Sequence, residues 1–217
     1  MRAWRDAALF HLLFGAAAAG VFYLLRPPQL GWGILGLVGL YNLLLPLIGS
    51  RAGHHEWLDL WIFLLPLSLL QVLPDWVLTQ QLGILGFPDL GGPRLGPVPA
   101  YMAGMWVIPL FWVLWLSEPS LLAAALLSLL LFGVAEWAAR PLHLWQPLHV
   151  AQTCGVAYYV LPAEMLLGWA AAYAFREVRG RNPVVRLWAA ACVSTFYTGA
   201  LVLAYFLSTH VALRLPH

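Results

Sequence analysis

The sequence predicts an all-α, polytopic membrane helix bundle. Of the 217 residues, 62% are hydrophobic and only 9% are charged, whereas soluble domains carry about 25% charged residues. The apolar residues also come in runs of about 20, which is the length of helix that crosses a hydrocarbon core. A water-soluble fold of this composition would expose large apolar patches. We therefore expect a single transmembrane helical domain over residues 1–217.

Seven runs are long and apolar enough to be transmembrane spans. The first follows Arg2 and Arg5 as in a signal peptide, but it continues through 21–25 and is interpreted as a retained helix. The third run is the shortest, and the stretch 76–87 either extends it beyond Pro74 or lies at the membrane interface. The predicted spans are 7–25, 31–48, 57–73, 99–117, 119–138, 150–175 and 185–207.

The longest segment between predicted spans is 74–98. It is rich in Gly and Pro, including Gly91, Gly92 and Pro93, which is typical of turns and loops. A loop of this length is either a functional lid or re-entrant element, or simply a connector.

The arginine distribution predicts the orientation. Seven spans place the termini on opposite sides of the membrane, and the side of the N-terminus then carries seven of the eleven basic residues, which favours a cytoplasmic N-terminus. The abundance of Ala, Leu, Gly, Pro and Trp, with no Lys, indicates a GC-rich bacterial genome and hence a bacterial cytoplasmic membrane. The seven are Arg2, Arg5, Arg51, Arg176, Arg179, Arg181 and Arg186, and the other four are Arg26, Arg94, Arg140 and Arg214.

Several function classes find no support in the sequence. The net charge is only +2 and no long basic tract is present, so nucleic acid is not an expected partner. Cys154 and Cys192 lie in apolar runs and are interpreted as small packing residues. The sequence contains no G-x-S-x-G, H-E-x-x-H or Walker-type motif. We expect neither a metal nor a cofactor.

Glu164 and Glu136 are the first candidates for catalysis, because an ionisable group within a membrane helix is costly and marks a functional site by default. Glu164 follows Pro162 deep in the sixth predicted span, where the proline is expected to kink the helix. A buried carboxyl group tends to stay protonated and can serve as a general acid. Alternatively, Glu164 is hydrogen-bonded to a neighbouring helix or paired with an Arg, and Glu136 pairs with Arg140 one turn away.

Two further polar groups lie near the ends of the predicted spans. The first group comprises His11, Asn42, His54, His55, Glu56 and Asp59. It has the residue types of a metal site, but their spacing matches no established ligand motif. The preferred interpretation is therefore a solvated loop followed by acidic residues that favour a helix N-terminus. The second group comprises Gln71, Asp75, Gln80, Gln81, Asp89, Arg94, His143, Gln146, His149 and Gln152. Within it, Asp75 is a turn or cap residue, or alternatively a third candidate acid.

Aromatic residues supply candidate substrate contacts. Many of the twelve Trp residues lie near predicted span ends, as in an interfacial aromatic belt. Others lie deeper and either line a cavity or are ordinary packed or lipid-facing side chains. The candidate substrate-binding residues are Trp106, Trp112, Trp169, Tyr101 and Tyr158.

The element Leu161-Pro162-Ala163-Glu164, with the chain length and span number, resembles two groups of membrane enzymes. These are the seven-helix terpene cyclases of fungal meroterpenoid pathways and the membrane lycopene cyclases. In lycopene cyclases a proline precedes paired acids, whereas Met165 stands at the second acid position here. The segments 10–14, 99–104 and 162–164 also resemble an uncharacterised bacterial membrane family.

The cyclase resemblance implies protonation of an isoprenoid by Glu164, Glu136 or Asp75, with aromatic rings stabilising the cation in a dry pocket. The partners would be the bilayer and a hydrophobic isoprenoid-like molecule. One alternative is a lipid- or pigment-binding subunit of a membrane complex, or an oligomer of such a subunit. The other alternative is a small proton-coupled transporter. A cyclase needs an apolar cavity with one or two acids. A transporter needs a polar route to both faces of the membrane. A lipid- or pigment-binding subunit needs neither feature.

Overall fold

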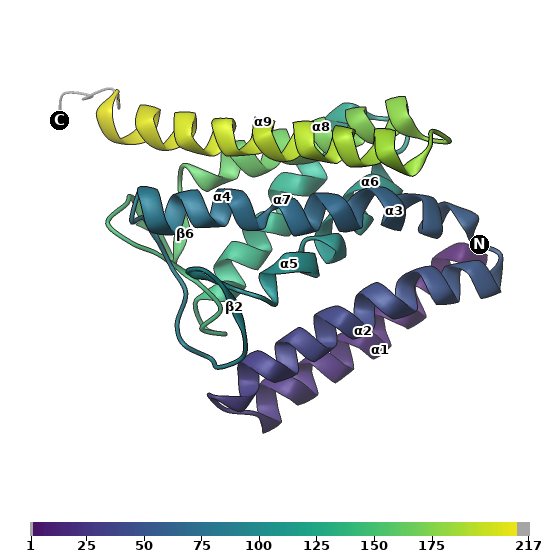
Figure 1. Cartoon of the computed structure of the whole chain (residues 1–217), viewed down its shortest axis with the longest axis horizontal. Coiled ribbons are helices and arrows are strands. Elements are labelled where there is room, and N and C mark those ends of the chain that lie inside the picture. Colours follow the sequence, from purple (N-terminus) through teal and green to yellow (C-terminus); the bar gives the residue numbers. More distant parts are fainter. Residues whose placement is uncertain (1, 212–217) are drawn as a thin grey trace.

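The computed structural model describes residues 2–211, most of which are helical (Figure 1). Arg214, counted above, lies outside these residues. The helices are α1 (Arg2–Leu24), α2 (Gln29–Ala52), α3 (His55–Leu70), α4 (Val72–Trp76), the π-helical turn η1 (Val77–Gln81), α5 (Met102–Met105), α6 (Val107–Ser117), α7 (Leu121–Ala139), α8 (Val160–Val178) and α9 (Pro183–His210).

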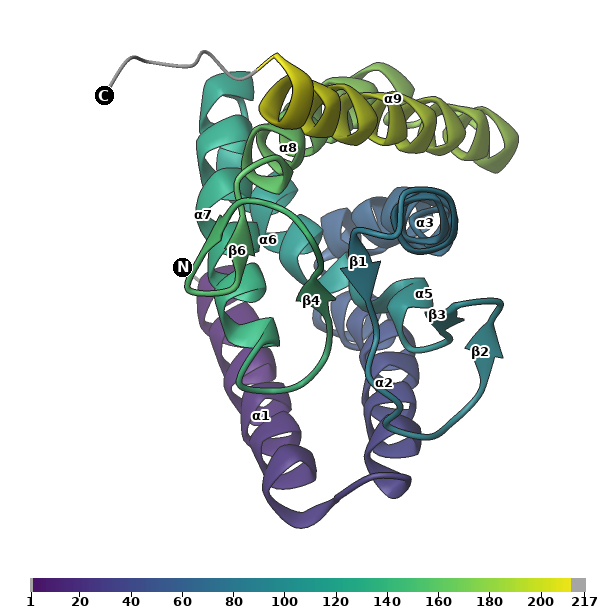
Figure 2. The ribbon, with the colours of Figure 1, turned by 90° about the vertical axis from the view of Figure 1, so that its left-hand side faces the viewer.

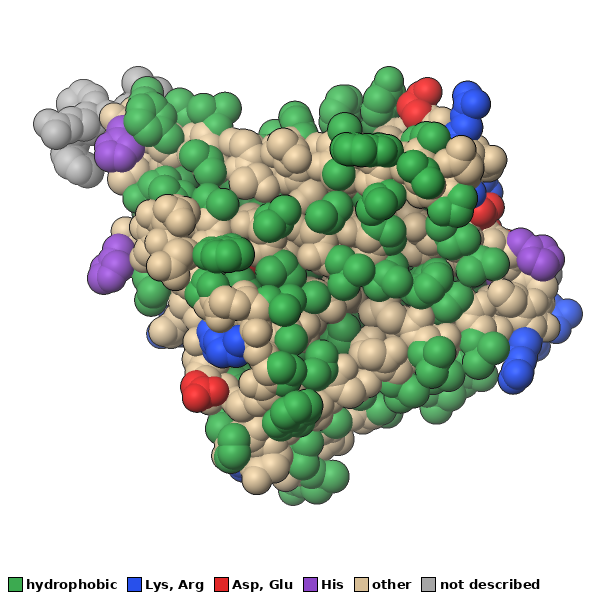
Figure 3. All heavy atoms as spheres, in the orientation of Figure 1, with side chains coloured by type: hydrophobic (Ala, Val, Ile, Leu, Met, Phe, Trp, Pro, Cys, Tyr) green, Lys and Arg blue, Asp and Glu red, His purple; other side chains and the backbone are tan. Residues whose placement is uncertain are grey.

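The described residues contain five helical segments long and apolar enough to cross a membrane, as expected for a multi-pass membrane protein. Large apolar side chains such as Leu12, Leu122 and Trp188 are exposed on the helices, and apolar side chains cover much of the face seen in Figure 3. Lipid is the solvent that suits such a surface. The five segments are Arg2–Leu24, Gln29–Ala52, His55–Gln81, Leu121–Ala139 and Pro183–His210.

The third helix continues through Pro74 to Gln81, so part of the stretch 76–87 extends it. A proline inside a helix cannot donate to the carbonyl four residues earlier, which here belongs to Leu70. The hydroxyl group of Ser194 on α9 donates to that carbonyl at 3.1 Å. A side chain distant in sequence thus satisfies the group that Pro74 leaves unpaired, and the helix passes the proline without ending.

The predicted span 150–175 is wrong over its first ten residues. These form a hairpin of β5 (Gln152–Thr153) and β6 (Val156–Ala157), and the turn between them contains Gly155 at φ +87°. Because α8 begins only at Val160, Pro162 is the third residue of the helix, where its missing N–H is not required. Pro162 therefore does not open a kink, and Glu164 lies near the beginning of its helix rather than deep within it.

Two loops distant in sequence meet at one end of the helices. Strand β1 (Leu85–Gly86), which follows η1, pairs antiparallel with β4 (Gln146–Pro147), which follows α7 (Figure 2). The N–H of Leu148 extends this pairing by donating to the carbonyl of Ile84 at 2.8 Å. A second small hairpin joins β2 (Arg94–Leu95) to β3 (Val98–Pro99). We call the β1–β4 pairing and its flanking loops the cap.

Helices α7 and α8 approach each other closely at Gly168. The side chain of Ser128 on α7 occupies the space that a Cβ at Gly168 would need. The Ser128 hydroxyl group donates to the backbone carbonyl of Glu164 at 2.7 Å. This contact fixes the backbone of Glu164 against α7, the helix that carries Glu136.

Four polar residues in or next to the first three helices, which the sequence placed in one group, each have a different hydrogen-bonding or ion-pair partner. His54 is buried rather than solvated, because it hydrogen-bonds Asp6 at 3.0 Å. Asp59 pairs with the buried guanidinium group of Arg186 at 3.0 Å. His11 hydrogen-bonds the hydroxyl group of Tyr41, and Asn42 donates to the carbonyl of Gly104. Over residues 2–211, no three His, Cys, Asp or Glu side chains are grouped as a metal site would require.

Candidate functional site

Three acidic side chains from three helices converge in the interior. Asp75 of α4 and Glu164 of α8 are buried, and Glu136 of α7 is partly buried. Glu136 lines one cavity with Asp75 and a second cavity with Glu164. None of the ion pairs found among the described residues involves any of the three, so Glu136 does not pair with Arg140. The sequence candidates for the acid thus share one region.

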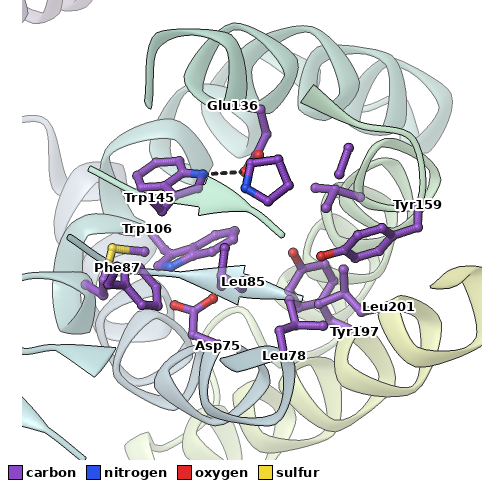
Figure 4. Close-up of a pocket in the computed structure, with 14 residues that line it drawn as sticks. Asp75, Leu78, Leu85, Phe87, Trp106, Glu136, Trp145, Tyr159, Tyr197 and Leu201 are labelled. Carbon is purple, nitrogen blue, oxygen red and sulfur yellow. Dashed lines mark hydrogen bonds between the residues drawn. The ribbon is translucent and has the colours of Figure 1, made fainter. Parts of the chain in front are cut away.

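A narrow cavity separates Asp75 from Glu136 (Figure 4). Its volume is about 30 Å³, which is room for about two water molecules. The carboxyl groups of Asp75 and Glu136 and the hydroxyl groups of Tyr159 and Tyr197 turn toward this space. Leu85 and Pro147 of the cap also line it. This water-sized cavity is too small for a lipid and large enough for a proton-conducting contact.

A larger, apolar cavity adjoins the first between α6 and α7. Its volume is about 300 Å³, at the lower end of small-molecule pockets. Of the residues that line it, only Glu136 and Glu164 are ionisable. The others are Met102, Met105, Trp106, Ile108, Pro109, Trp112, Leu131, Phe132, Ala135 and Trp145. The two cavities share Met102, Trp106, Glu136 and Trp145.

The polar atoms around these cavities are only partly satisfied. The indole N–H of Trp145 donates to Glu136 Oε1 at 3.0 Å. Within residues 2–211, no partner is found for Asp75 Oδ2, Glu164 Oε2 or Trp106 Nε1. The amide nitrogen and oxygen of Gln71, one turn before Asp75, are buried and unpaired in the same way. Most buried polar groups in folded proteins are hydrogen-bonded to protein or to ordered water, so these atoms have hydrogen-bonding capacity left for a water molecule or a ligand.

The backbone beside Asp75 is also irregular. The π-helical turn η1 begins two residues after Asp75, and its Leu78 lines the narrow cavity. Single π-helical turns occur frequently at functional sites. Asp75 lies inside a helix rather than at a turn, whereas Asp89 accepts from the N–H of Gly91 at 3.0 Å and is a turn residue.

The five candidate substrate contacts lie in different places. Trp106 and Trp112 line the apolar cavity. Tyr101 is buried and donates to the carbonyl of Leu144 at 3.2 Å, which anchors the loop after α7. Tyr158 is exposed and lies along a groove between α8 and α9. Trp169 is at the surface, where it stacks on Tyr173 with ring centroids 5.9 Å apart.

Several cavity residues were missed from the sequence. Tyr159 directly precedes α8, and Tyr197 lies in the middle of α9. Trp145 lies between the fifth and sixth predicted spans, and it is one of the tryptophans near span ends that the sequence assigns to an interfacial belt. The only sequence signal for Tyr197 is its setting among Ser194, Thr195 and Thr198, a polar cluster within an apolar run.

The model of one protein family, described as a domain of unknown function (DUF6989), matches residues 72–208. The chain belongs to the DUF6989 family. The matched region contains Asp75, Glu136 and Glu164, whereas α1 and α2 precede it. Comparisons with curated proteins and with solved structures give no match. The family description names no activity, so a functional proposal for this DUF6989 protein has to come from its site.

Proposed function

We propose that this DUF6989 protein is an integral-membrane enzyme that acts on an isoprenoid or another lipid-soluble substrate, and that the reaction is an acid-initiated cyclisation of a terpene or carotenoid. One observation carries the proposal. The apolar cavity between α6 and α7 has tryptophan walls, and its only ionisable lining residues are Glu136 and Glu164.

Glu164 is the proposed general acid. Glu164 Oε2 is buried without a hydrogen-bond partner among the described residues, whereas Glu136 Oε1 is engaged by Trp145. The carboxyl proton of Glu164 would pass to a carbon of a substrate double bond, leaving a cation on the adjacent carbon. Another double bond then closes the ring, and loss of a proton ends the reaction. The faces of Trp106 and Trp112 supply the π-electrons that stabilise such a cation.

The same cavity argues against the other two functions. In a lipid- or pigment-binding subunit without catalytic activity, the carboxyl group of Glu164 would be fully hydrogen-bonded or ion-paired within the helix bundle. A proton-coupled transporter needs a polar route to both faces, but apart from the two acids the residues around the larger cavity are apolar or aromatic. The cavity also lies beside α7, whose Leu130 and Val134 are exposed at the molecular surface, and this suits lateral entry of a lipid-soluble substrate.

The proposal includes the membrane topology. We propose seven crossing segments, with α5–α6 and α8 added to the five long helices, and a cytoplasmic N-terminus in a bacterial cytoplasmic membrane. Arginine side chains gather at the end of the molecule where the N-terminus lies (Figure 3). An excess of arginine on the cytoplasmic side is the usual pattern.

Product analysis in a heterologous host tests the function. The protein is expressed in bacteria that make carotenoids or farnesylated quinols, and lipid extracts are compared by mass spectrometry. We expect a product of unchanged mass and altered retention with the wild type and with Glu118→Gln, a control at an exposed ion pair. Glu164→Gln should abolish it. Absence of any new product across the panel overturns the enzyme proposal, and retention of an unaltered isoprenoid by the purified protein would indicate a lipid- or pigment-binding subunit.

A further inference from the structure

Glu136 occupies a singular position between the two cavities. Among the three acids, Asp75 lines only the narrow cavity and Glu164 only the apolar cavity, whereas Glu136 lines both. Its carboxyl group is held at this boundary by the indole N–H of Trp145, which also lines both cavities. A proton moving between Asp75 and Glu164 would therefore meet Glu136 on the way.

The narrow cavity has the size and lining of a proton-conducting contact. It has room for about two water molecules, and two carboxyl groups and two tyrosine hydroxyl groups face it. Asp75 Oδ2 has no protein partner among residues 2–211, so it is free to bind such a water molecule. Leu85 and Pro147 of the cap and Ala157 of β6 line the same cavity with apolar side chains.

We propose that Glu136 is a proton-relay residue that connects Glu164 in the apolar cavity to Asp75 through water in the narrow cavity. The inference rests on the proposed function, because it identifies Glu164 as the acid that must be reloaded after each turnover.

The relay conserves one proton. When the carboxyl group of Glu164 has given its proton to the substrate, the O–H bond of Glu136 breaks and an O–H bond forms on Glu164. The Glu136 carboxylate then takes a proton from a water molecule in the narrow cavity, and this water takes one from the carboxyl group of Asp75. At the end of the reaction Glu136 passes its proton back through the same water to the Asp75 carboxylate, and the Glu136 carboxylate, which lines the apolar cavity, takes the proton that the substrate cation releases. No proton is gained or lost overall, so the site needs no external acid.

Hydrogen–deuterium exchange at the Glu164 carboxyl group tests the relay without any substrate. The full-length protein in lipid nanodiscs is transferred from H₂O to D₂O, and the shift of the protonated carboxyl C=O band is followed by time-resolved infrared spectroscopy. The Glu164 band is assigned by its loss in Glu164→Gln. We expect Glu136→Gln and Asp75→Asn each to slow its exchange about tenfold or more, as for loss of a proton-transfer group. Glu118→Gln is the matched control and should exchange at the wild-type rate.

Two results would overturn the relay. One is wild-type exchange at Glu164 in a folded Glu136→Gln protein, and the other is the absence of any protonated-carboxyl band attributable to Glu164. If Glu136→Gln does not fold, Glu136→Asp and Trp145→Phe serve instead, and unchanged exchange in both counts against the relay. Slowed exchange without any cyclised product would retain the relay and refute the enzyme proposal, whereas product formation with unchanged exchange would refute the relay alone.

Discussion

Trp145 and Glu136 join the cap to the acidic site. Trp145 lies immediately before β4, and its indole N–H donates to Glu136 Oε1 at 3.0 Å. Because β4 pairs with β1, the position of the cap and the orientation of the Glu136 carboxyl group are mechanically linked. A displaced cap would leave Glu136 free to rotate away from the boundary of the two cavities.

Trp145→Phe should therefore lower the rate of product formation strongly and the free energy of unfolding only slightly. Loss of one hydrogen bond of this kind costs about 1 kcal/mol of folding free energy. Misplacement of a reacting group by about 1 Å costs up to about 100-fold in rate, so we expect product formation to fall between about tenfold and 100-fold. Both quantities are measured in the isoprenoid-producing host and by thermal unfolding in detergent. Trp137→Phe, at an exposed tryptophan of α7, is the control; equal rates for the two variants would contradict the linkage.

Ser194→Ala should destabilise the protein through the third helix. The Leu70 carbonyl that Pro74 leaves unpaired loses its donor, and a buried unsatisfied group costs about 1–3 kcal/mol. The expected result is a lower midpoint of thermal unfolding, together with faster amide exchange around residues 70–76. Ser208→Ala removes an exposed serine hydroxyl bond within α9 and should change the midpoint little. A midpoint for Ser194→Ala equal to that of Ser208→Ala would show that the carbonyl finds another donor.

Gly168→Ala should separate α7 from α8. The added methyl group would overlap Ser128 Cβ and lie 2.8 Å from the carbonyl oxygen of Ala124. Overpacking of this kind costs about 1–3 kcal/mol, and the expected loss of stability is measured by thermal unfolding. Gly199→Ala, where nothing lies within 4 Å, is the matched control and should be neutral or slightly stabilising because alanine favours helix. Wild-type stability of Gly168→Ala would be incompatible with the close approach.

Gln71→Leu should keep or raise stability. Both polar atoms of this fully buried amide lack partners among the described residues, so an apolar side chain of similar size removes a desolvation cost rather than a bond. If Gln71 orders water beside Asp75, exchange at the Glu164 carboxyl group slows at the same time. Destabilisation by about 1 kcal/mol or more would show that the amide is satisfied in the folded protein.

Most of the helices could be predicted from the sequence because each is an uninterrupted apolar run. The failures have local causes. The segment 150–159 is apolar enough to extend a span, yet Gly155 takes a positive φ and the chain forms a hairpin. The sequence left open whether the third helix continues beyond Pro74, because the donor that satisfies the Leu70 carbonyl is on Ser194, far along the sequence.

The three acids could be picked out of the sequence as candidates because carboxyl groups are rare in this apolar chain. Their grouping into two adjoining cavities could not be predicted, since it depends on how α4, α7 and α8 pack. Trp145 and Tyr159 were missed for the same reason. Trp145 lies in the cap loop before β4, and Tyr159 lies in the turn between β6 and α8, so each reaches the site only through the folding of a loop.

The pairing of β1 with β4 also constrains the biogenesis of the protein. The two strands are separated by the whole of α5, α6 and α7, so the chain must be synthesised beyond residue 147 before they can meet. Glu164 follows only later, on α8. During insertion, Asp75 and Glu136 therefore enter the membrane before the structure that covers them exists.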